Sequence, residues 1–100
     1  MPPFEIRYLL TAEKDLEGIF DYILKDNAAA ASDLLEKFDH TIAHLSNQPY
    51  MGVVPNDNRL RRMGYRMLVI GNYLVFYVVK GQTVQIRRII HGARRYSFLL

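Results

Sequence analysis

The chain contains no cysteine among its 100 residues. Disulfide bonds and thiolate chemistry are therefore excluded, and the absence fits a reducing compartment. No run of about 18 consecutive apolar residues occurs, so the sequence predicts no transmembrane helix. Residues 1–16, MPPFEIRYLLTAEKDL, lack the basic start, apolar stretch and small-residue cleavage site of a secretory signal peptide, so we expect none.

Acidic residues are missing from the C-terminal part of the chain. All ten lie at or before Asp57, and against four basic residues they give positions 1–58 a net charge of −6. Positions 59–100 hold nine basic residues and no acidic one, a net charge of +9, and eight of the nine are arginines. Arginine binds carboxylates and phosphates through a planar fork, which favours recognition of an acidic protein or a nucleic acid. The alternative is that basic strands pair with acidic helices of the same molecule.

The length and the large hydrophobic fraction predict a single domain over residues 1–100. Residues 4–9 alternate enough for a short strand, and Thr11 is expected to be the N-cap of a first helix. Asp26 and Asn27 break that helix, and a second one begins in the alanine run 28–31 and ends before Pro49. The two apolar stripes comprise Leu16, Ile19, Phe20 and Ile23 in the first helix and Leu34, Leu35, Phe38, Ile42 and Leu45 in the second.

The period changes to that of strands after a loop at residues 49–58. Residues 63–70, 73–79 and 84–90 are rich in Val, Ile, Tyr and Phe, and short hairpin connections join them into an antiparallel meander. We therefore predict an α+β fold in the order β-α-α-β-β-β. An N-terminal strand and an antiparallel helical hairpin pack on an antiparallel, twisted sheet of three to four strands, whose other face is open or partly open.

Two adjacent arginines in the last predicted strand, Arg87 and Arg88, must point to opposite faces. Strict alternation places Arg88 on the more apolar and therefore inward face, which it would share with Val84, Ile86 and Ile90. A half-buried charge needs a partner, and we expect Asp15 or Glu17 of the first helix to form a structural charge pair with Arg88. Arg87 and His91 are expected on the open face.

The arginines expected to bind a partner on that face are Arg59, Arg61, Arg62, Arg66 and Arg87. Tyrosines in the strands are expected to pack in the core, with base stacking beside the arginines as the alternative; they are Tyr65, Tyr73 and Tyr77. His40 and His44 have the i, i+4 spacing of metal ligands, but they point away from the apolar stripe and no third ligand is indicated. We predict no metal and no cofactor.

His91, Arg94, Arg95 and Tyr96 form the densest group of reactive side chains in the sequence. Histidine transfers protons near neutral pH, and arginine stabilises the additional charge of a phosphoryl transition state. These are the components of a metal-free ribonuclease. The alternative is that the same residues bind carboxylates of a partner or pack the end of the chain.

Three segments resemble a known family. They are AEKDLEGIFDYI in the first helix, LEKFDHTIAHLSNQPYMG in the second, and GYRMLVIGNYLVFYVVKGQTVQIRRIIHGARRY across the strands. This pattern resembles the RelE/ParE toxins of bacterial type II toxin–antitoxin modules. The resemblance implies a cytoplasmic toxin that inhibits growth, serves plasmid stabilisation and is neutralised by a directly bound antitoxin with an acidic toxin-binding segment.

The family divides into RelE-like enzymes, which cleave mRNA on the ribosome without metal, and ParE-like inhibitors of DNA gyrase. RelE-like ribonucleases carry an arginine early in the strand that here begins with Tyr73. Arg94 matches their arginine after the last strand, but Leu100 stands where they have a tyrosine. Where they carry a pair of lysines, this sequence has arginines instead.

The YoeB-type relatives end in a His-Tyr pair, whereas four residues separate His91 from Tyr96 here. The resemblance therefore favours a ParE-like gyrase inhibitor. The alternative is a RelE-like endoribonuclease that uses His91, Arg94, Arg95 and Tyr96 on the ribosome with its mRNA.

Overall fold

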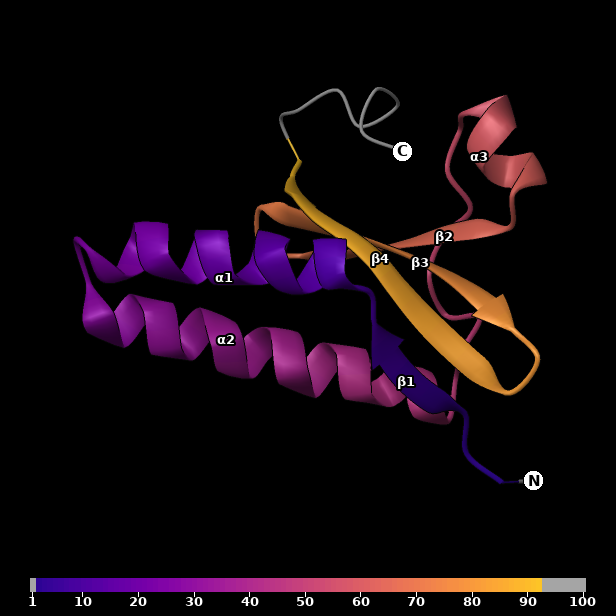
Figure 1. Cartoon of the computed structure of the whole chain (residues 1–100), viewed down its shortest axis with the longest axis horizontal. Coiled ribbons are helices and arrows are strands. Elements are labelled where there is room, and N and C mark those ends of the chain that lie inside the picture. The colour runs from indigo at the N-terminus through magenta and orange to yellow at the C-terminus, as the bar shows by residue number, and fades with distance from the viewer. Residues whose placement is uncertain (1, 93–100) are drawn as a thin grey trace.

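The computed structural model describes residues 2–92. Their elements, shown in Figure 1, are β1 (Glu5–Tyr8), α1 (Leu10–Leu24), α2 (Ala28–Ala43), the 3₁₀ turn η1 (His44–Ser46), α3 (Asn58–Arg62), β2 (Tyr65–Ile70), β3 (Tyr73–Lys80) and β4 (Thr83–His91). The order confirms the predicted α+β layout. One short helix, α3, was not expected, because the sequence was assigned to a loop up to residue 58 and to the period of strands after it.

The four strands form one sheet in the order β1-β4-β3-β2. The hairpins β2–β3 and β3–β4 are antiparallel, whereas β1 pairs with β4 in parallel, so the sheet is mixed. Two-residue hairpins require antiparallel neighbours, but the helical hairpin that follows β1 is long enough for a parallel crossover. Gly71 and Gly81 each have a φ of 59°, which the first position of a two-residue type II′ turn requires.

The helical hairpin breaks at Asp26 and Asn27, as the sequence predicts. The Asn27 side chain caps α2 by accepting a hydrogen bond of 3.0 Å from the Ala30 amide. Thr11, in contrast, does not cap α1: Leu9 is the N-cap, and no side chain bonds there. The Thr11 hydroxyl instead donates to the Arg87 carbonyl at 3.1 Å, because α1 begins directly against the edge of β4.

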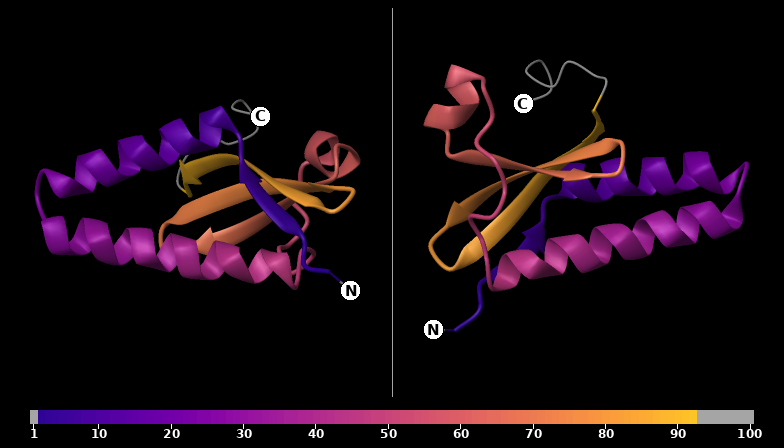
Figure 2. Two further views of the ribbon diagram at one scale, coloured as in Figure 1. Left: turned by 60° about the horizontal axis from the view of Figure 1, so that its bottom comes forward. Right: turned by 180° about the vertical axis from the view of Figure 1, so that it is seen from behind.

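Both faces of the sheet are covered, although unequally. Figure 2 shows the helical hairpin against the sheet and α3 at the opposite end of the molecule from the α1–α2 loop. The main core lies on the helix side and contains Ala12, Phe38, Ile42, Leu45, Leu68, Ile70, Val75, Tyr77, Val84, Ile86 and Ile89. A second, smaller core covers part of the face that was expected to be open; it contains Leu60, Tyr65, Phe76, Val78 and Ile90.

A β-bulge in β4 changes which residues share a face. Phe76 pairs with Arg88 and Tyr77 with Ile86, so Arg87 has no residue opposite it. Ile89 consequently joins the main core, whereas the next residue, Ile90, belongs to the second core. The expectation that Val84, Ile86 and Ile90 share one face with Arg88 is therefore wrong for Val84 and Ile86, which belong to the main core. Arg88 lies opposite Phe76 and so shares with Ile90 the face of the second core, not that of the main core. Strict alternation of side chains could not predict this distribution over the two faces. A bulge inserts one residue, so every side chain of the strand beyond it points to the opposite face from the one that alternation assigns.

The fully buried side chain of Leu60 tests whether the second core stabilises the fold. We expect Leu60→Ala to lower the free energy of unfolding by about 3 kcal/mol, because it leaves a cavity between α3 and the sheet. Denaturant unfolding of the full chain measures the loss. Met63→Ala, at a side chain that is 47% exposed beside α3, is the matched control. Equal and small losses for both variants would show that α3 contributes no core.

Candidate partner-binding surface

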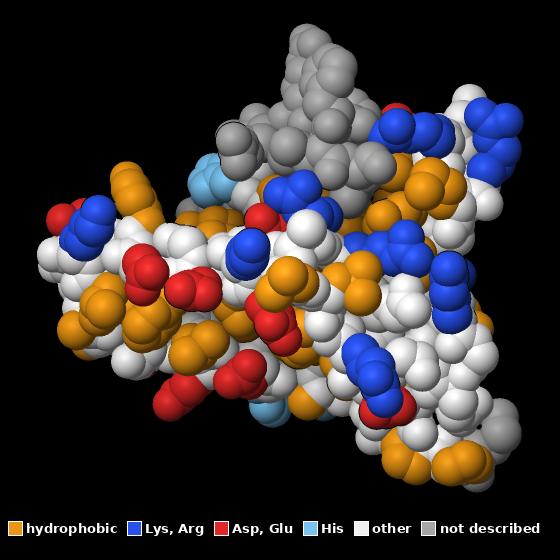
Figure 3. Space-filling model, in the orientation of Figure 1, with side chains coloured by type: hydrophobic (Ala, Val, Ile, Leu, Met, Phe, Trp, Pro, Cys, Tyr) orange, Lys and Arg blue, Asp and Glu red, His pale blue; other side chains and the backbone are white. Residues whose placement is uncertain are grey.

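Three exposed arginines lie on α3, and we call Arg59, Arg61 and Arg62 the arginine face. Asp57 begins this helix, since its carboxylate accepts a hydrogen bond of 3.0 Å from the Leu60 amide. Leu60 anchors the helix in the second core, which directs its neighbours to solvent. Figure 3 shows basic side chains gathered toward α3 and acidic ones over the helical hairpin. The charge asymmetry of the sequence therefore becomes a separation in space.

Arg66 was expected to bind a partner, but its guanidinium already has acceptors within the chain. Nη1 donates to the carbonyls of Tyr50 at 3.1 Å and Gly52 at 2.9 Å. The group also lies 5.1 Å from the centre of the Tyr50 ring. The Gly52 amide donates to the Tyr77 hydroxyl at 2.9 Å, and a Cβ on Gly52 would come within 2.6 Å of that oxygen. Arg66 thus holds residues 50–52 beside β2.

Arg87 also packs within the molecule. Its guanidinium lies 5.5 Å from the centre of the Tyr65 ring, and Nη2 donates to the Gln85 side chain at 3.0 Å. The Nε atom is buried and has no hydrogen-bond partner among residues 2–92. Arg87 is half-buried, so it borders the arginine face without being one of its exposed members.

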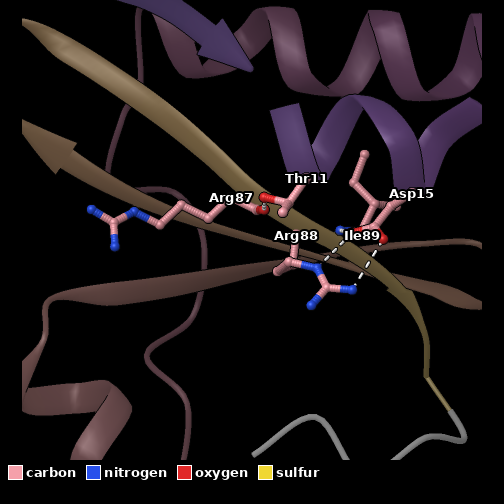
Figure 4. A network of polar contacts seen from close by, with 5 residues as sticks. All are labelled: Thr11, Asp15, Arg87, Arg88 and Ile89. Atoms are coloured by element: carbon pink, nitrogen blue, oxygen red, sulfur yellow. Dashed lines mark hydrogen bonds and ion pairs between the residues drawn. The ribbon is translucent and has the colours of Figure 1, made fainter. Parts of the chain in front are cut away.

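Arg88 forms a charge pair with Asp15, one of the two acids expected from the sequence. Nε and Nη2 donate to the two carboxylate oxygens at 2.7 and 3.0 Å, and this hydrogen bonding raises the pKa of Arg88. The Ile89 amide donates to the same carboxylate at 2.9 Å. Figure 4 shows that Asp15 and Thr11 of α1 together reach the edge of β4 where β1 has ended. The pattern of the sequence gave no sign of the bond to the Ile89 amide.

His91 lies at the end of β4, exposed, with its ring 5.4 Å from that of Tyr73 in an edge-on arrangement. The other residues expected to act with it, Arg94, Arg95 and Tyr96, lie outside the described residues.

Core packing is confirmed for two of the three strand tyrosines. Tyr77 is fully buried and Tyr65 is 5% exposed, so neither ring can stack on a base. Burial raises the pKa of the Tyr77 phenol. Tyr73 is half-buried, and its ring lies 5.9 Å from that of Phe38.

His40 and His44 are exposed on α2, with their rings 5.0 Å apart and edge-on. Within residues 2–92, no group of three or more His, Cys, Asp or Glu side chains is arranged to hold a metal ion. None of the helices in this part of the chain has the length and hydrophobicity needed to cross a lipid bilayer.

Sequence reasoning missed α3, although a signal for it was present. Asp57 directly precedes the five residues of α3, and aspartate is a preferred N-cap. The two prolines and the glycine of residues 49–58 led to the assignment of a loop up to Asn58, and the residues after it were assigned the period of the strands that follow. A helix of five residues is too short to show an apolar period.

The charge pair between Asp15 and Arg88 generates a stability prediction. We expect Asp15→Ala to lower the free energy of unfolding by about 2–4 kcal/mol, because a half-buried guanidinium and the Ile89 amide lose an acceptor together. Urea denaturation measures the loss. The control is Glu5→Ala, which breaks an exposed pair with Arg7 and should cost less than about 1 kcal/mol. A loss no larger than that of the control would contradict a structural role for Asp15.

Tyr8 generates a pH prediction, because burial and the nearby Asp39 carboxylate raise the pKa of its phenol from 10.0 to about 12. Below pH 10 the phenol is protonated in the folded and unfolded chains alike. Above that pH the unfolded chain loses the proton first, so stability should fall until the folded phenol ionises near pH 12. Tyr8→Phe should flatten this decline in denaturant unfolding at rising pH. An unchanged decline would contradict the assignment to Tyr8.

Comparisons with known proteins identify the family. Among solved structures, a chain of the chromosomal ParDE toxin–antitoxin system from P. aeruginosa is similar, with a TM-score of 0.73, 19% identity and coverage of 88% of this chain and 95% of that chain. A chain of the toxin–antitoxin complex RelBE2 from Mycobacterium tuberculosis has a TM-score of 0.60 and 24% identity, covering 89% of this chain and 98% of that chain. At these identities the similarity shows the fold.

No curated protein sequence matches this one significantly. The sequence model of the ParE toxin of type II toxin–antitoxin systems, parDE, matches residues 6–96. This match covers most of the chain and confirms the resemblance found in the sequence: the chain belongs to the family of ParE toxins of type II toxin–antitoxin systems.

Proposed function

We propose that this protein is a cytoplasmic toxin that inhibits DNA gyrase by binding to it, and that a cognate antitoxin neutralises it. The observation that carries the proposal is the match to ParE toxins over residues 6–96. Tyr73 supports it further, because RelE-like ribonucleases have an arginine at the start of the strand where Tyr73 stands.

The surroundings of Tyr73 explain why an arginine would be unfavourable at this position of the chain. Its half-buried ring packs between the rings of Phe38 and His91, whose centres lie 5.9 and 5.4 Å away. An arginine would place a charge against an apolar side chain of the main core, which is unfavourable unless the charge is paired. This position therefore serves packing, and a charge that could hold a scissile phosphate is missing from it.

A RelE-like ribosome-dependent endoribonuclease is the second candidate. The exposed imidazole of His91 favours it, since a histidine at the rim of a sheet can transfer protons. Arg94, Arg95 and Tyr96 would have to supply the remaining groups. The alternative predicts cleavage of mRNA, which binding to gyrase does not.

The antitoxin is proposed to bind the arginine face through an acidic segment. The structural neighbours from P. aeruginosa and M. tuberculosis belong to toxin–antitoxin systems, which supports a partner of this kind. Arg61 and Arg62 are both exposed, and the Arg62 Nε donates a long hydrogen bond of 3.4 Å to the Asn58 carbonyl. Their guanidinium groups are therefore available for bidentate pairing with carboxylates.

Two assays on the purified full-length chain separate the two candidates. We expect inhibition of DNA supercoiling by gyrase and no cleavage of mRNA on programmed ribosomes. The physical reason is that ParE-like action needs a binding surface, whereas cleavage needs a complete set of catalytic side chains. Cleavage of ribosome-bound mRNA with unaffected supercoiling would replace the first candidate by the second.

The arginine face can be tested separately from the cellular target. Arg61→Gln combined with Arg62→Gln should weaken binding of an acidic antitoxin by about tenfold at low salt, because two exposed ion pairs are lost. Titration calorimetry at two salt concentrations measures this. Lys25→Gln with Lys37→Gln is the matched control, since it removes the same charge from exposed positions of the hairpin. Equal effects of the two double variants would show that only net charge matters.

A further inference from the structure

Two histidines lie one helical turn apart at the C-terminal end of α2. His40 belongs to the last turn of the helix, and His44 follows as its C-cap with helical dihedral angles, φ −62° and ψ −23°. Side chains four positions apart on a helix are neighbours. Both imidazoles are exposed, and the centres of their rings are 5.0 Å apart. The fold therefore keeps together two side chains that the sequence marked only by their spacing.

No polar interaction within the described part of the chain occupies these two imidazoles. Neither side chain forms a hydrogen bond or an ion pair with another of residues 2–92. The two rings meet edge-on, with an angle of 87° between their planes. Because no polar contact holds this arrangement, rotation about the side-chain bonds can turn one nitrogen of each ring toward a shared ligand.

The backbone beneath the pair is held in place from both sides. Phe38, Ile42 and Leu45, which alternate with the histidines along the chain, are buried in the main core. The hydroxyl of Ser46, the last residue of η1, donates to the Phe4 carbonyl at 2.9 Å, and the Phe4 amide donates to the Ser46 carbonyl at 2.8 Å. A ligand that binds both rings therefore does not have to order the backbone first, which lowers the cost of binding.

The separation of the rings suits a shared metal ion. Zinc binds imidazole nitrogens at about 2.0–2.1 Å, and at a tetrahedral angle the centres of two rings on one ion lie about 5 Å apart. The observed separation of 5.0 Å agrees with this value. Imidazole is a good ligand for Zn²⁺, Cu²⁺ and Ni²⁺, whereas Mg²⁺ prefers oxygen ligands. The geometry thus fits a transition-metal ion better than an alkaline-earth ion.

The surroundings of the pair favour a cation. Three of the charged residues of α2 are acidic and one, Lys37, is basic, so the helix has a net charge of −2 without its histidines. The C-terminal end of a helix also carries a partial negative charge, and both histidines lie at this end of α2. The helix dipole and the carboxylates attract a divalent cation, and Lys37 opposes it with a single charge.

We propose that His40 and His44 chelate one divalent transition-metal ion, Zn²⁺, Cu²⁺ or Ni²⁺, through one imidazole nitrogen each, while water fills the remaining coordination positions. The sequence predicted no metal because no third ligand was indicated, and residues 2–92 supply none. A bidentate pair binds without a third ligand, because the second bond forms within a complex that already exists. The inference depends neither on gyrase as the target nor on the arginine face.

Titration calorimetry of the full-length chain with zinc chloride measures this binding. We expect one zinc ion per chain at the tightest site. His40→Ala and His44→Ala should each weaken its binding by at least about tenfold, and the double variant by little more, because the chelate is lost with its first ligand. Magnesium chloride in excess should not compete, since Mg²⁺ binds oxygen ligands.

A relocated histidine provides the matched control. His44→Gln with Asn47→His keeps the number of histidines and the net charge, but places the pair seven positions, or about two turns, apart. This variant should bind zinc as weakly as His44→Ala. His91→Gln should bind zinc as the wild type does, because His91 lies at the end of β4 and not on α2.

Nuclear magnetic resonance of the imidazole nitrogens locates the ion without any substitution. In the wild-type chain the signals of His40 and His44 should shift together, and saturate at one equivalent of zinc. Signals that stay unchanged, or that shift for one histidine alone, would overturn the proposal. So would equal zinc affinities of the wild type and the relocated variant, with circular dichroism showing that both are folded.

Discussion

The Asp15 carboxylate joins the helical hairpin to the sheet, and much of the structure depends on that connection. β1 covers the edge of β4 only as far as Ile86, and beyond it the strand would expose unpaired backbone groups. Thr11 and Asp15 take over at that point by bonding the Arg87 carbonyl and the Ile89 amide. The first turns of α1 thus serve as the continuation of β1, and the same carboxylate neutralises Arg88.

The basic residues that the structure describes after position 58 do not form one uniform surface. Arg66, Arg87 and Arg88 are each held by acceptors or rings within the chain. Arg61 and Arg62 remain exposed because Leu60 is the residue of α3 that packs in the second core, and its neighbours on the helix face solvent. The alternative of internal pairing, which the charge pattern left open, is therefore realised for Arg88, and a partner is needed only for part of the basic set.

The acidic residues show a corresponding division. Asp15 is committed to the fold, whereas Glu13, Glu17 and Asp39 surround apolar side chains that the hairpin does not bury. The molecule consequently offers two surfaces of opposite charge, one on α3 and one on the hairpin. An acidic partner is attracted to the surface on α3 and repelled by the one on the hairpin, and a basic partner the reverse. Electrostatic steering and like-charge repulsion can therefore direct the two kinds of partner to different surfaces.

Local patterns were sufficient for the family and for all the described elements except α3 and the 3₁₀ turn η1. The periodic spacing of apolar residues predicted the two long helices, and runs of β-branched residues predicted the strands. Asn27 marked the break between the helices, and glycines marked the turns of the β-hairpins. All of these signals depend only on neighbours in the sequence. The pair between Arg88 and an acid of α1 also followed from the cost of burying a charge.

Only the tertiary structure decided the parallel pairing of β1, the bulge at Arg87, and the separation of the arginines into structural and exposed ones. Each of these depends on contacts between residues far apart in the chain, such as the 73 positions between Asp15 and Arg88. The sequence by itself determined which side chains carry charge, and the fold determined which of those charges are left for a partner.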